Sequence, residues 1–142
     1  MKTLLLGLLL LLGAPALAQT LVEVTTVAAI ASSLDASVRF PSGSFKAGRG
    51  SEAIVARIPD ASRFNLEVYA ARGVAARLQP GFVQQILTSF AASGYFVENQ
   101  QETQVAGEVR TRYNLRDEAG RAAILFVVRK GDELVFAFGK VK

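Results

Sequence analysis

The chain contains no cysteine, no histidine and no tryptophan. Without cysteine there is no disulfide, no thiol nucleophile, no lipid-modified cysteine and no ordinary structural zinc site. Without histidine the chain lacks the usual proton shuttle near neutral pH and the commonest transition-metal ligand. These absences predict a protein that is not an enzyme, has no metal or cofactor, and depends on packing alone for its stability.

The groups left for catalysis are carboxylates, serine and lysine, and none of them forms a recognised pattern. Asp117-Glu118 and Asp132-Glu133 are adjacent acidic pairs, but each falls in a predicted tight turn, where such side chains are normally solvated. No G-x-S-x-G or S-x-x-K motif occurs. Gly48-Arg49-Gly50-Ser51 is similar to a phosphate-binding loop, but that loop needs a helix behind it, and the next residues predict a strand. We therefore expect no catalytic residues and a flexible hairpin connection at this loop.

Residues 1–18 have the pattern of a cleavable secretory signal peptide. Lys2 precedes an apolar run over Leu4–Leu12, which is followed by Gly13, Pro15 and the small-x-small triplet Ala16-Leu17-Ala18. The alternative, an uncleaved membrane anchor, needs about 20 apolar residues, roughly twice the length of this run. We therefore expect cleavage near Ala18-Gln19, no membrane span in the mature chain, and export to the periplasm or the extracellular space.

Residues 19–142 predict a single exported domain. The segment is long enough to bury a core, and it contains no internal repeat, low-complexity tract or linker. The whole chain has 16 basic and 12 acidic residues, a net charge of +4. This excess is too small to predict a nucleic-acid partner, because such binding needs concentrated neutralisation of phosphates.

The N-terminal half of this domain predicts short strands. Leu21–Leu34 is ambiguous, because Leu21–Val24 fits a strand and the alanine-rich Val27–Leu34 fits a short helix. The remaining expectations are a short strand over Ala36–Phe40 that stops at Pro41, a loop over Ser42–Gly50, a strand over Ala53–Ile58, and a period-two strand from Phe64 to Ala70 with one buried face.

The clearest element is a helix over Pro80–Ser93. Phe82, Ile86 and Phe90 recur at helical spacing and form an apolar stripe. Proline suits the first turn of a helix, where its missing N–H costs nothing. Gly94 stands where a left-handed C-terminal cap is favoured.

The C-terminal half predicts strands and turns. We expect a short strand over Tyr95–Glu98, a turn over Asn99–Thr103, and a three-strand meander over Val105–Arg116, Ala122–Lys130 and Glu133–Phe138. Gly131-Asp132 has glycine first, as a type II′ turn prefers. The predicted fold class is therefore α+β: an antiparallel sheet with a C-terminal three-strand meander and one main helix packed on a face.

The two meander turns also predict a strand register. Closing the first turn places Arg112 opposite Leu125, and closing the second places Leu125 opposite Phe138. In this register the face beneath the helix consists of Val109, Thr111, Tyr113, Leu115, Ile124, Phe126, Val128, Val135 and Ala137. The opposite face sets arginines around an apolar floor. Its candidate ligand-binding residues are Arg110, Arg112, Arg116, Arg121, Arg129, Phe136 and Phe138.

Two interpretations of this arginine-bordered face stay open. Arginine on an outer strand usually lays its methylenes over apolar neighbours and keeps its guanidinium in water, and Glu108 falls opposite Arg129 to pair part of the charge. The functional interpretation is a shallow site, in which guanidinium groups hold a carboxylate or phosphate and the phenylalanines take an apolar tail.

The order of elements after Leu66 resembles the PsbP-like fold group of exported proteins. The likeness rests on four segments: Arg39-Phe40-Pro41, Phe82–Gly94, Val105-Ala106-Gly107 and Lys130-Gly131-Asp132-Glu133. The tryptophan that usually follows the proline in that group is absent here. The resemblance implies an accessory or binding domain with no catalytic residues to carry over.

These observations favour a small, non-enzymatic exported protein that binds a protein, or an anionic or amphipathic small molecule, in the cell envelope. The alternative is a structural or interaction protein that acts as a homodimer through an apolar face and has no small-molecule ligand. A monomer that retains a ligand distinguishes the first hypothesis from the second.

Overall fold

The computed structural model describes residues 30–142. The predicted signal peptide, its cleavage site and the ambiguous segment up to residue 29 lie outside the described residues. Within residues 30–142, no helix is both long and apolar enough to cross a bilayer.

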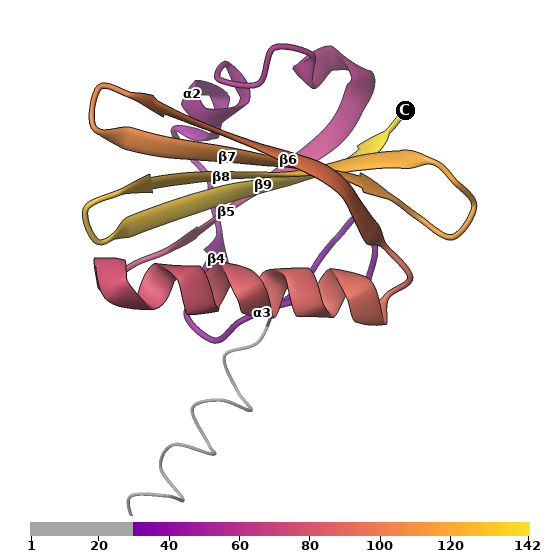
Figure 1. Ribbon diagram of the computed structural model, residues 1–142, viewed down its shortest axis with the longest axis horizontal. Coiled ribbons are helices and arrows are strands. Elements are labelled where there is room, and N and C mark those ends of the chain that lie inside the picture. Colours follow the sequence, from indigo (N-terminus) through magenta and orange to yellow (C-terminus); the bar gives the residue numbers. More distant parts are fainter. Residues whose placement is uncertain (1–29) are drawn as a thin grey trace, which may run out of the picture.

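Six antiparallel strands form the central sheet, in the order β4-β5-β9-β8-β7-β6 (Figure 1). They are β4 (Ser44–Lys46), β5 (Phe64–Ala71), β6 (Phe96–Val105), β7 (Glu108–Arg116), β8 (Ala122–Lys130) and β9 (Glu133–Val141). A separate two-stranded ladder joins β2 (Ile30–Ala31) to β3 (Arg39–Phe40). The helical elements are α2 (Ser51–Val55), η2 (Ala61–Arg63), η3 (Ala76–Leu78) and α3 (Gln79–Ala92). The predicted α+β fold with one main helix and a C-terminal run of antiparallel strands is confirmed.

The main core lies between α3 and one face of the sheet (Figure 1). The stripe of Phe82, Ile86 and Phe90 is buried there, as its helical spacing predicts. The helix begins one residue before Pro80, which therefore lies in the first turn. Gly94 has φ +91°, the left-handed conformation expected after the helix end.

A second, smaller core lies on the opposite face of the sheet, on the side of α2 (Figure 1). Ile54, Val55 and Ile58 pack against it. The prediction of a strand over Ala53–Ile58 is wrong, because residues 51–55 form a helix instead. A short apolar run is compatible with either element, and here three apolar side chains reach the sheet from one helical turn and its exit.

Two further sequence predictions are wrong because these segments are strands through pairing with neighbouring strands, and such pairing leaves no signal in the local sequence. Ser42–Gly50 is not wholly a loop, since β4 lies inside it and pairs with β5. Asn99–Thr103 is not a turn, since β6 runs through it without a break. The turn lies instead at Ala106-Gly107, where φ is +53° and +81°, and it divides the predicted strand Val105–Arg116. All ten residues of β6 are exposed, so neither face carries the apolar alternation that reveals a strand.

The register of the meander is correct in one hairpin and wrong by one residue in the other. Leu125 pairs with Phe138 across β8 and β9, as predicted. Across β7 and β8, however, Arg112 pairs with Phe126 rather than with Leu125. The connection includes Arg121, whose carbonyl accepts a hydrogen bond from the Asp117 amide, and so it is one residue longer than predicted. A shift of one residue moves every side chain of a strand to the other face relative to its neighbour.

The face beneath α3 therefore differs from the predicted one. Tyr113 and Leu115 do lie there, but they are joined by Leu125, Phe136 and Phe138. The residues Ile124, Phe126, Val128 and Ala137, which the predicted register placed under the helix, belong to the second core.

A buried carboxylate fastens the N-terminal segment to the sheet. Glu67 of β5 is only 6 % exposed. Its carboxylate accepts hydrogen bonds from the Ser32 hydroxyl, from the Ser33 amide at 3.1 and 3.2 Å, and from the Tyr69 hydroxyl at 2.8 Å. Because buried polar groups need such partners, this cluster holds residues 32–33 at a fixed place on β5.

The Tyr69 hydroxyl gives the fold an alkaline limit. Burial raises the pKa of Tyr69 to about 12, and the hydrogen bond to Glu67 acts in the same direction. Tyrosine in an unfolded chain titrates near pH 10, so the contribution of Tyr69 to stability is complete below about pH 10 and is lost as the pH rises through 12.

We expect the free energy of unfolding to fall between pH 10 and 12, with Tyr69 contributing up to about 1.4 kcal/mol per pH unit. Burial also raises the pKa of Tyr95 and Tyr113, so Tyr69→Phe should reduce the slope without abolishing it. Urea denaturation at a series of alkaline pH values measures this slope. An identical slope in Tyr69→Phe would contradict the assignment.

Candidate functional site

The three β7 arginines of the predicted site share one face of the sheet, and each is bound to a carboxylate. Arg110 Nε lies 3.0 Å from Glu108 Oε1, and Arg116 Nε lies 2.8 Å from Glu98 Oε2. Arg112 binds both oxygens of Asp60, at 2.5 and 2.9 Å. A guanidinium held by two parallel hydrogen bonds is strongly fixed in its orientation.

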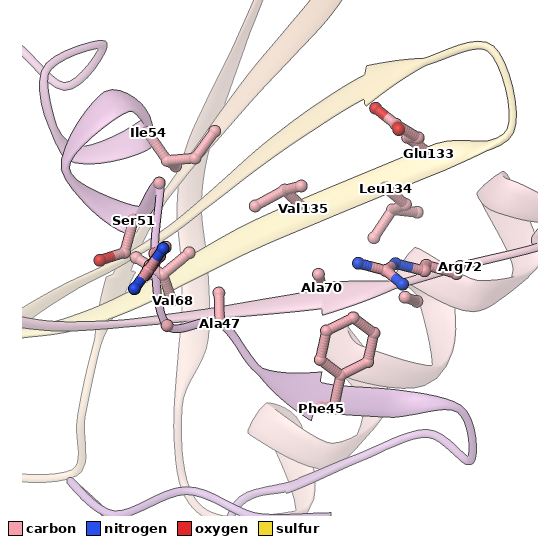
Figure 2. Close-up of a pocket in the computed structure, with 14 residues that line it drawn as sticks. Phe45, Ala47, Ser51, Ile54, Val68, Ala70, Arg72, Glu133, Leu134 and Val135 are labelled. Atoms are coloured by element: carbon pink, nitrogen blue, oxygen red, sulfur yellow. The ribbon is translucent and has the colours of Figure 1, made fainter.

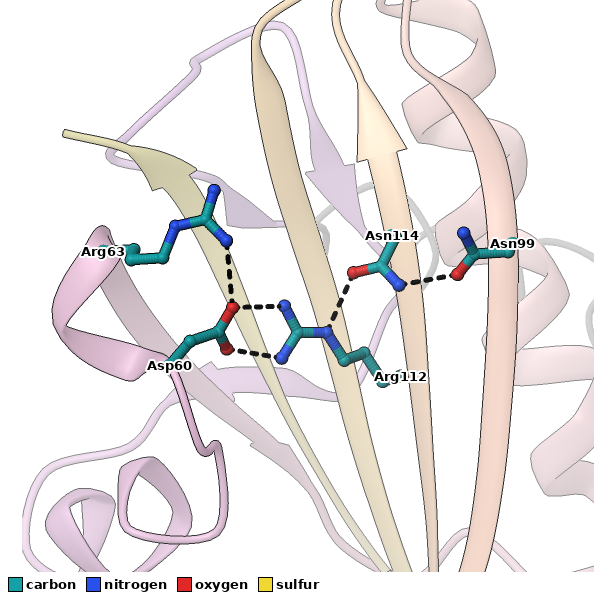
Figure 3. A network of polar contacts seen from close by, with 5 residues as sticks. All are labelled: Asp60, Arg63, Asn99, Arg112 and Asn114. Atoms are coloured by element: carbon teal, nitrogen blue, oxygen red, sulfur yellow. Dashed lines mark hydrogen bonds and ion pairs between the residues drawn. The ribbon is translucent and has the colours of Figure 1, made fainter.

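Arg112 is the centre of an extended polar network (Figure 3). Its Nε donates to Asn114 Oδ1 at 2.9 Å, and Asn114 in turn donates to Asn99 of β6 at 2.6 Å. Arg63 donates to Asp60 Oδ2, which Arg112 also binds, at 3.2 Å (Figure 3). The hydrogen bonds from Arg112 hold the pKa of Asp60 below its ordinary value, despite some burial. The network links η2, β7 and β6, so these side chains stabilise the fold.

Glu108 is the centre of a second network. Arg57, which follows α2, binds both of its oxygens at 3.0 and 2.9 Å, and Arg110 binds one of them. The hydrogen bonds from Arg57, followed by those from Arg110, lower the pKa of Glu108. The positive charge of Arg57 and Arg110 is therefore partly compensated within the protein.

The remaining predicted site residues lie elsewhere. Arg121 donates to the Val141 carbonyl at 3.3 Å, at the end of the sheet. Arg129 pairs with Val109, on the face of β7 opposite to Arg110 and Arg112, and its guanidinium lies 3.8 Å from Glu102.

Phe136 and Phe138 do not form an open floor. Both are fully buried in the main core, beneath α3. Because the register of the first hairpin is shifted by one residue, they lie on the face of the sheet opposite to Arg110, Arg112 and Arg116. The structure thus brings these three arginines together with Ile124, Phe126 and Val128 rather than with the two phenylalanines.

A groove of about 450 Å³ opens elsewhere on this α2 side of the sheet, between β4, β5, β9 and the loop before α2 (Figure 2). Its central row crosses three strands, since Ala70 pairs with Phe45 on one side and with Val135 on the other. The alanine between two larger side chains leaves the hollow. Val68 and Ile54 continue the apolar floor toward α2. The volume lies within the range of small-molecule sites, about 300–1,000 Å³.

Two arginines line this groove, and neither forms an ion pair with any residue in the described part of the chain. The guanidinium carbon of Arg72 lies 5.4 Å from the centre of the Phe45 ring, in a cation–π contact. Arg49 lies in the turn before α2. Among the described residues that line the groove, Glu133 at the start of β9 is the one with a carboxylate (Figure 2).

The sequence contains only a weak signal for this site. The segment Gly48-Arg49-Gly50-Ser51, which is similar to a phosphate-binding loop, lines one edge of the groove. Arg72 lies twenty-three positions further on, after β5, and the pairing of β4 with β5 is what brings Phe45 beside it. Because the predicted loop concealed β4, sequence reasoning missed both Phe45 and Arg72.

A smaller hollow of about 250 Å³ lies near the end of α3, lined by Asp35, Ser93, Tyr95, Asp117, Glu118, Ala119 and Lys140. The Tyr95 hydroxyl donates to Asp35 at 2.8 Å. Burial raises the pKa of Asp35, but hydrogen bonds from Ser37 and Tyr95 outweigh it, so the pKa lies below its ordinary value. No group of three or more acidic side chains within residues 30–142 is arranged to hold a metal ion.

A scan against protein-family models finds no match for the chain, and searches of curated proteins and of solved structures find no significant match. The resemblance to the PsbP-like fold group is therefore neither supported nor opposed by these comparisons, and it stays a prediction.

Proposed function

We propose that this is a non-enzymatic exported protein that binds a small anionic, amphipathic molecule in the groove between β4, β5 and β9. The observation that carries the proposal is the combination of an open apolar hollow with two arginines, Arg49 and Arg72, that have no carboxylate partner in the described structure. Guanidinium groups are suited to carboxylate and phosphate heads, and the apolar floor is suited to a short hydrocarbon tail.

Charge compensation decides between this groove and the β7 arginines. Arg110, Arg112 and Arg116 already have carboxylate partners within 3.0 Å, so an incoming anion would have to displace them. In the groove an anion meets guanidinium groups whose charge is not compensated by an ion pair. The head group is expected beside Arg72 and Phe45, with the tail over Ala70 and Val68. Glu133 lies on the same side of the groove, since its neighbour Leu134 pairs with Ala71, the neighbour of Arg72, and its charge therefore weakens this binding rather than directing it.

Substitutions in the groove test the proposal. We expect Arg72→Ala to weaken binding of octyl phosphate roughly tenfold or more, because a hydrogen bond to a charged group contributes about 1.5–3 kcal/mol. Ala70→Leu should also weaken binding, because the larger side chain fills the hollow between Phe45 and Val135. Isothermal titration calorimetry on the protein measures both effects, below the micelle-forming concentration of the probe.

Arg77→Ala is the matched control, since it removes the same charge from an exposed residue of η3 outside the groove. It should bind octyl phosphate as the unaltered protein does, and all three variants should unfold at a similar temperature. Equal loss of affinity in Arg72→Ala and Arg77→Ala would mean that only net charge matters, and it would refute a site in the groove.

A further inference from the structure

The outer edge of β6 is the longest unpaired strand edge in the described structure. β6 is ten residues long, ends the six-stranded sheet, and pairs only with β7 (Figure 1). All ten residues are exposed, so neither face of the strand is covered. Such an edge presents a row of free N–H and C=O groups and is a template for another strand.

Exposed apolar side chains concentrate on the same strand. Of the five large exposed hydrophobic residues in the described part of the chain, three belong to β6: Phe96 at 57 %, Val97 at 43 % and Val105 at 45 %. A single exposed apolar side chain needs no explanation. Three on one unpaired edge indicate a surface that becomes covered.

The apolar residues are placed symmetrically about the middle of the strand. Gln101 pairs with Arg112, while Phe96 and Val105 pair with Arg116 and Glu108, which lie four positions to either side of Arg112. Because of the β-bulge between Val97 and Asn99, one residue of β6 has no partner of its own in β7. Phe96 and Val105 therefore lie the same number of ladder positions from Gln101. Residues an even number of ladder positions apart share a face, so Phe96, Gln101 and Val105 project to the same side.

We propose that β6 pairs with β6 of a second copy of this chain, antiparallel, about a two-fold axis at Gln101. This register places Phe96 of each copy opposite Val105 of the other, and Gln101 opposite its own equivalent. It also places Glu102 opposite Gln100 and Asn99 opposite Thr103, so no two like charges face each other. The two sheets then form one continuous sheet through an isologous interface.

The neighbouring registers are less favourable. An axis at Glu102 sets two glutamates directly opposite each other, which is destabilising. An axis at Gln100 leaves Phe96 opposite Thr103 and gives the apolar side chains no apolar partner. The symmetry of the apolar positions about Gln101 is what favours a second copy over an unrelated peptide, because an unrelated strand does not require it.

Charge substitutions at the axis test the pairing. Gln101→Lys and Gln101→Glu each set two like charges opposite each other, and each should weaken the dimer about tenfold or more. An equimolar mixture of the two variants should form a dimer again, because lysine then faces glutamate. Sedimentation equilibrium over a range of protein concentrations measures all three. Gln84→Lys, on the exposed side of α3, is the matched control and should dimerise as the unaltered protein does.

Cysteine substitution tests the register, since the natural chain has no cysteine to interfere. Gln101→Cys should form a disulfide-linked dimer under mild oxidation, because residues directly opposite in a ladder have Cα atoms close enough for a disulfide. Gln84→Cys should not form one.

A protein that stays monomeric at high concentration would overturn the proposal, and so would a dimer that survives Gln101→Lys. The groove lies at the other edge of the sheet, so its ligand binding succeeds or fails independently.

Discussion

Phe136→Ala is expected to lower the free energy of unfolding by about 3–5 kcal/mol, as is usual when a buried phenylalanine is truncated. The Phe136 ring is fully buried beneath α3. Its centre lies 5.1 Å from that of Phe40, 5.6 Å from that of Tyr69 and 6.3 Å from that of Phe82. The alanine variant loses both the burial of the ring and its contacts with these neighbours, and it leaves a cavity between β9 and the helix. For a domain whose total stability is about 5–15 kcal/mol, this is a large share.

Urea denaturation of both proteins measures the loss from the two midpoints, provided that the slopes agree. Leu78→Ala is the control, because it truncates an apolar side chain of η3 that is 52 % exposed, and it should change stability by no more than about 0.5 kcal/mol. A loss below 1 kcal/mol in Phe136→Ala would instead fit the open floor that the sequence-based register places there.

Glu67→Ala is expected to lower the free energy of unfolding by about 3 kcal/mol or more, although it removes a buried charge and introduces no larger side chain. The Glu67 carboxylate accepts hydrogen bonds from Ser32, Ser33 and Tyr69 in a buried place. Removing it leaves three donors without their acceptor, and each buried donor without an acceptor costs about 1–3 kcal/mol. The N-terminal segment should detach from β5 first, so hydrogen exchange of the amides from 32 to 40 should rise more than that of β8.

Chemical denaturation gives the total loss of stability, and Glu52→Ala is the control. Glu52 is an exposed residue of α2, and its truncation should be close to neutral. If Glu67→Ala were as stable as Glu52→Ala, the carboxylate would not be the anchor of the N-terminal segment. If Glu67→Ala lost stability but hydrogen exchange rose equally across the whole domain, the carboxylate would not act mainly on the N-terminal segment.

The sequence predicted those elements whose signal is local. The stripe of Phe82, Ile86 and Phe90 sets the position of α3, and Gly131 as the first residue of a two-residue turn sets the register of β8 against β9. Both signals lie within a few residues of the structure that they predict.

The misses have a common physical cause. β6 and β4 are strands because a neighbouring strand pairs with them, and their own side chains carry no period-two pattern. In the first meander hairpin, one additional turn residue, Arg121, is enough to exchange the faces of β7 relative to β8. The same error affected the candidate site, because the predicted floor of Phe136 and Phe138 depended on the register of β7 against β8.

The groove could not be predicted from the sequence for a related reason. Unlike the arginines of β7, Arg49 and Arg72 form no ion pair within residues 30–142, and ion-pair partners are set by tertiary structure. Asp60 lies fifty-two positions from Arg112, and Glu108 lies fifty-one from Arg57. Composition shows that basic residues are in excess, but only the fold shows which of them are compensated.

The most direct test of a groove for anionic amphipathic ligands is a comparison of three probes by two-dimensional NMR on the ¹⁵N-labelled protein. Octyl phosphate, octanol and octyltrimethylammonium share the same tail and differ in the charge of the head. We predict saturable shifts from octyl phosphate at the amides of residues 45–54, 68–72 and 133–135, weaker shifts at the same amides from octanol, and none from the cation. Shifts from octyl phosphate confined to β7, or equal shifts from all three probes, would contradict the proposed function.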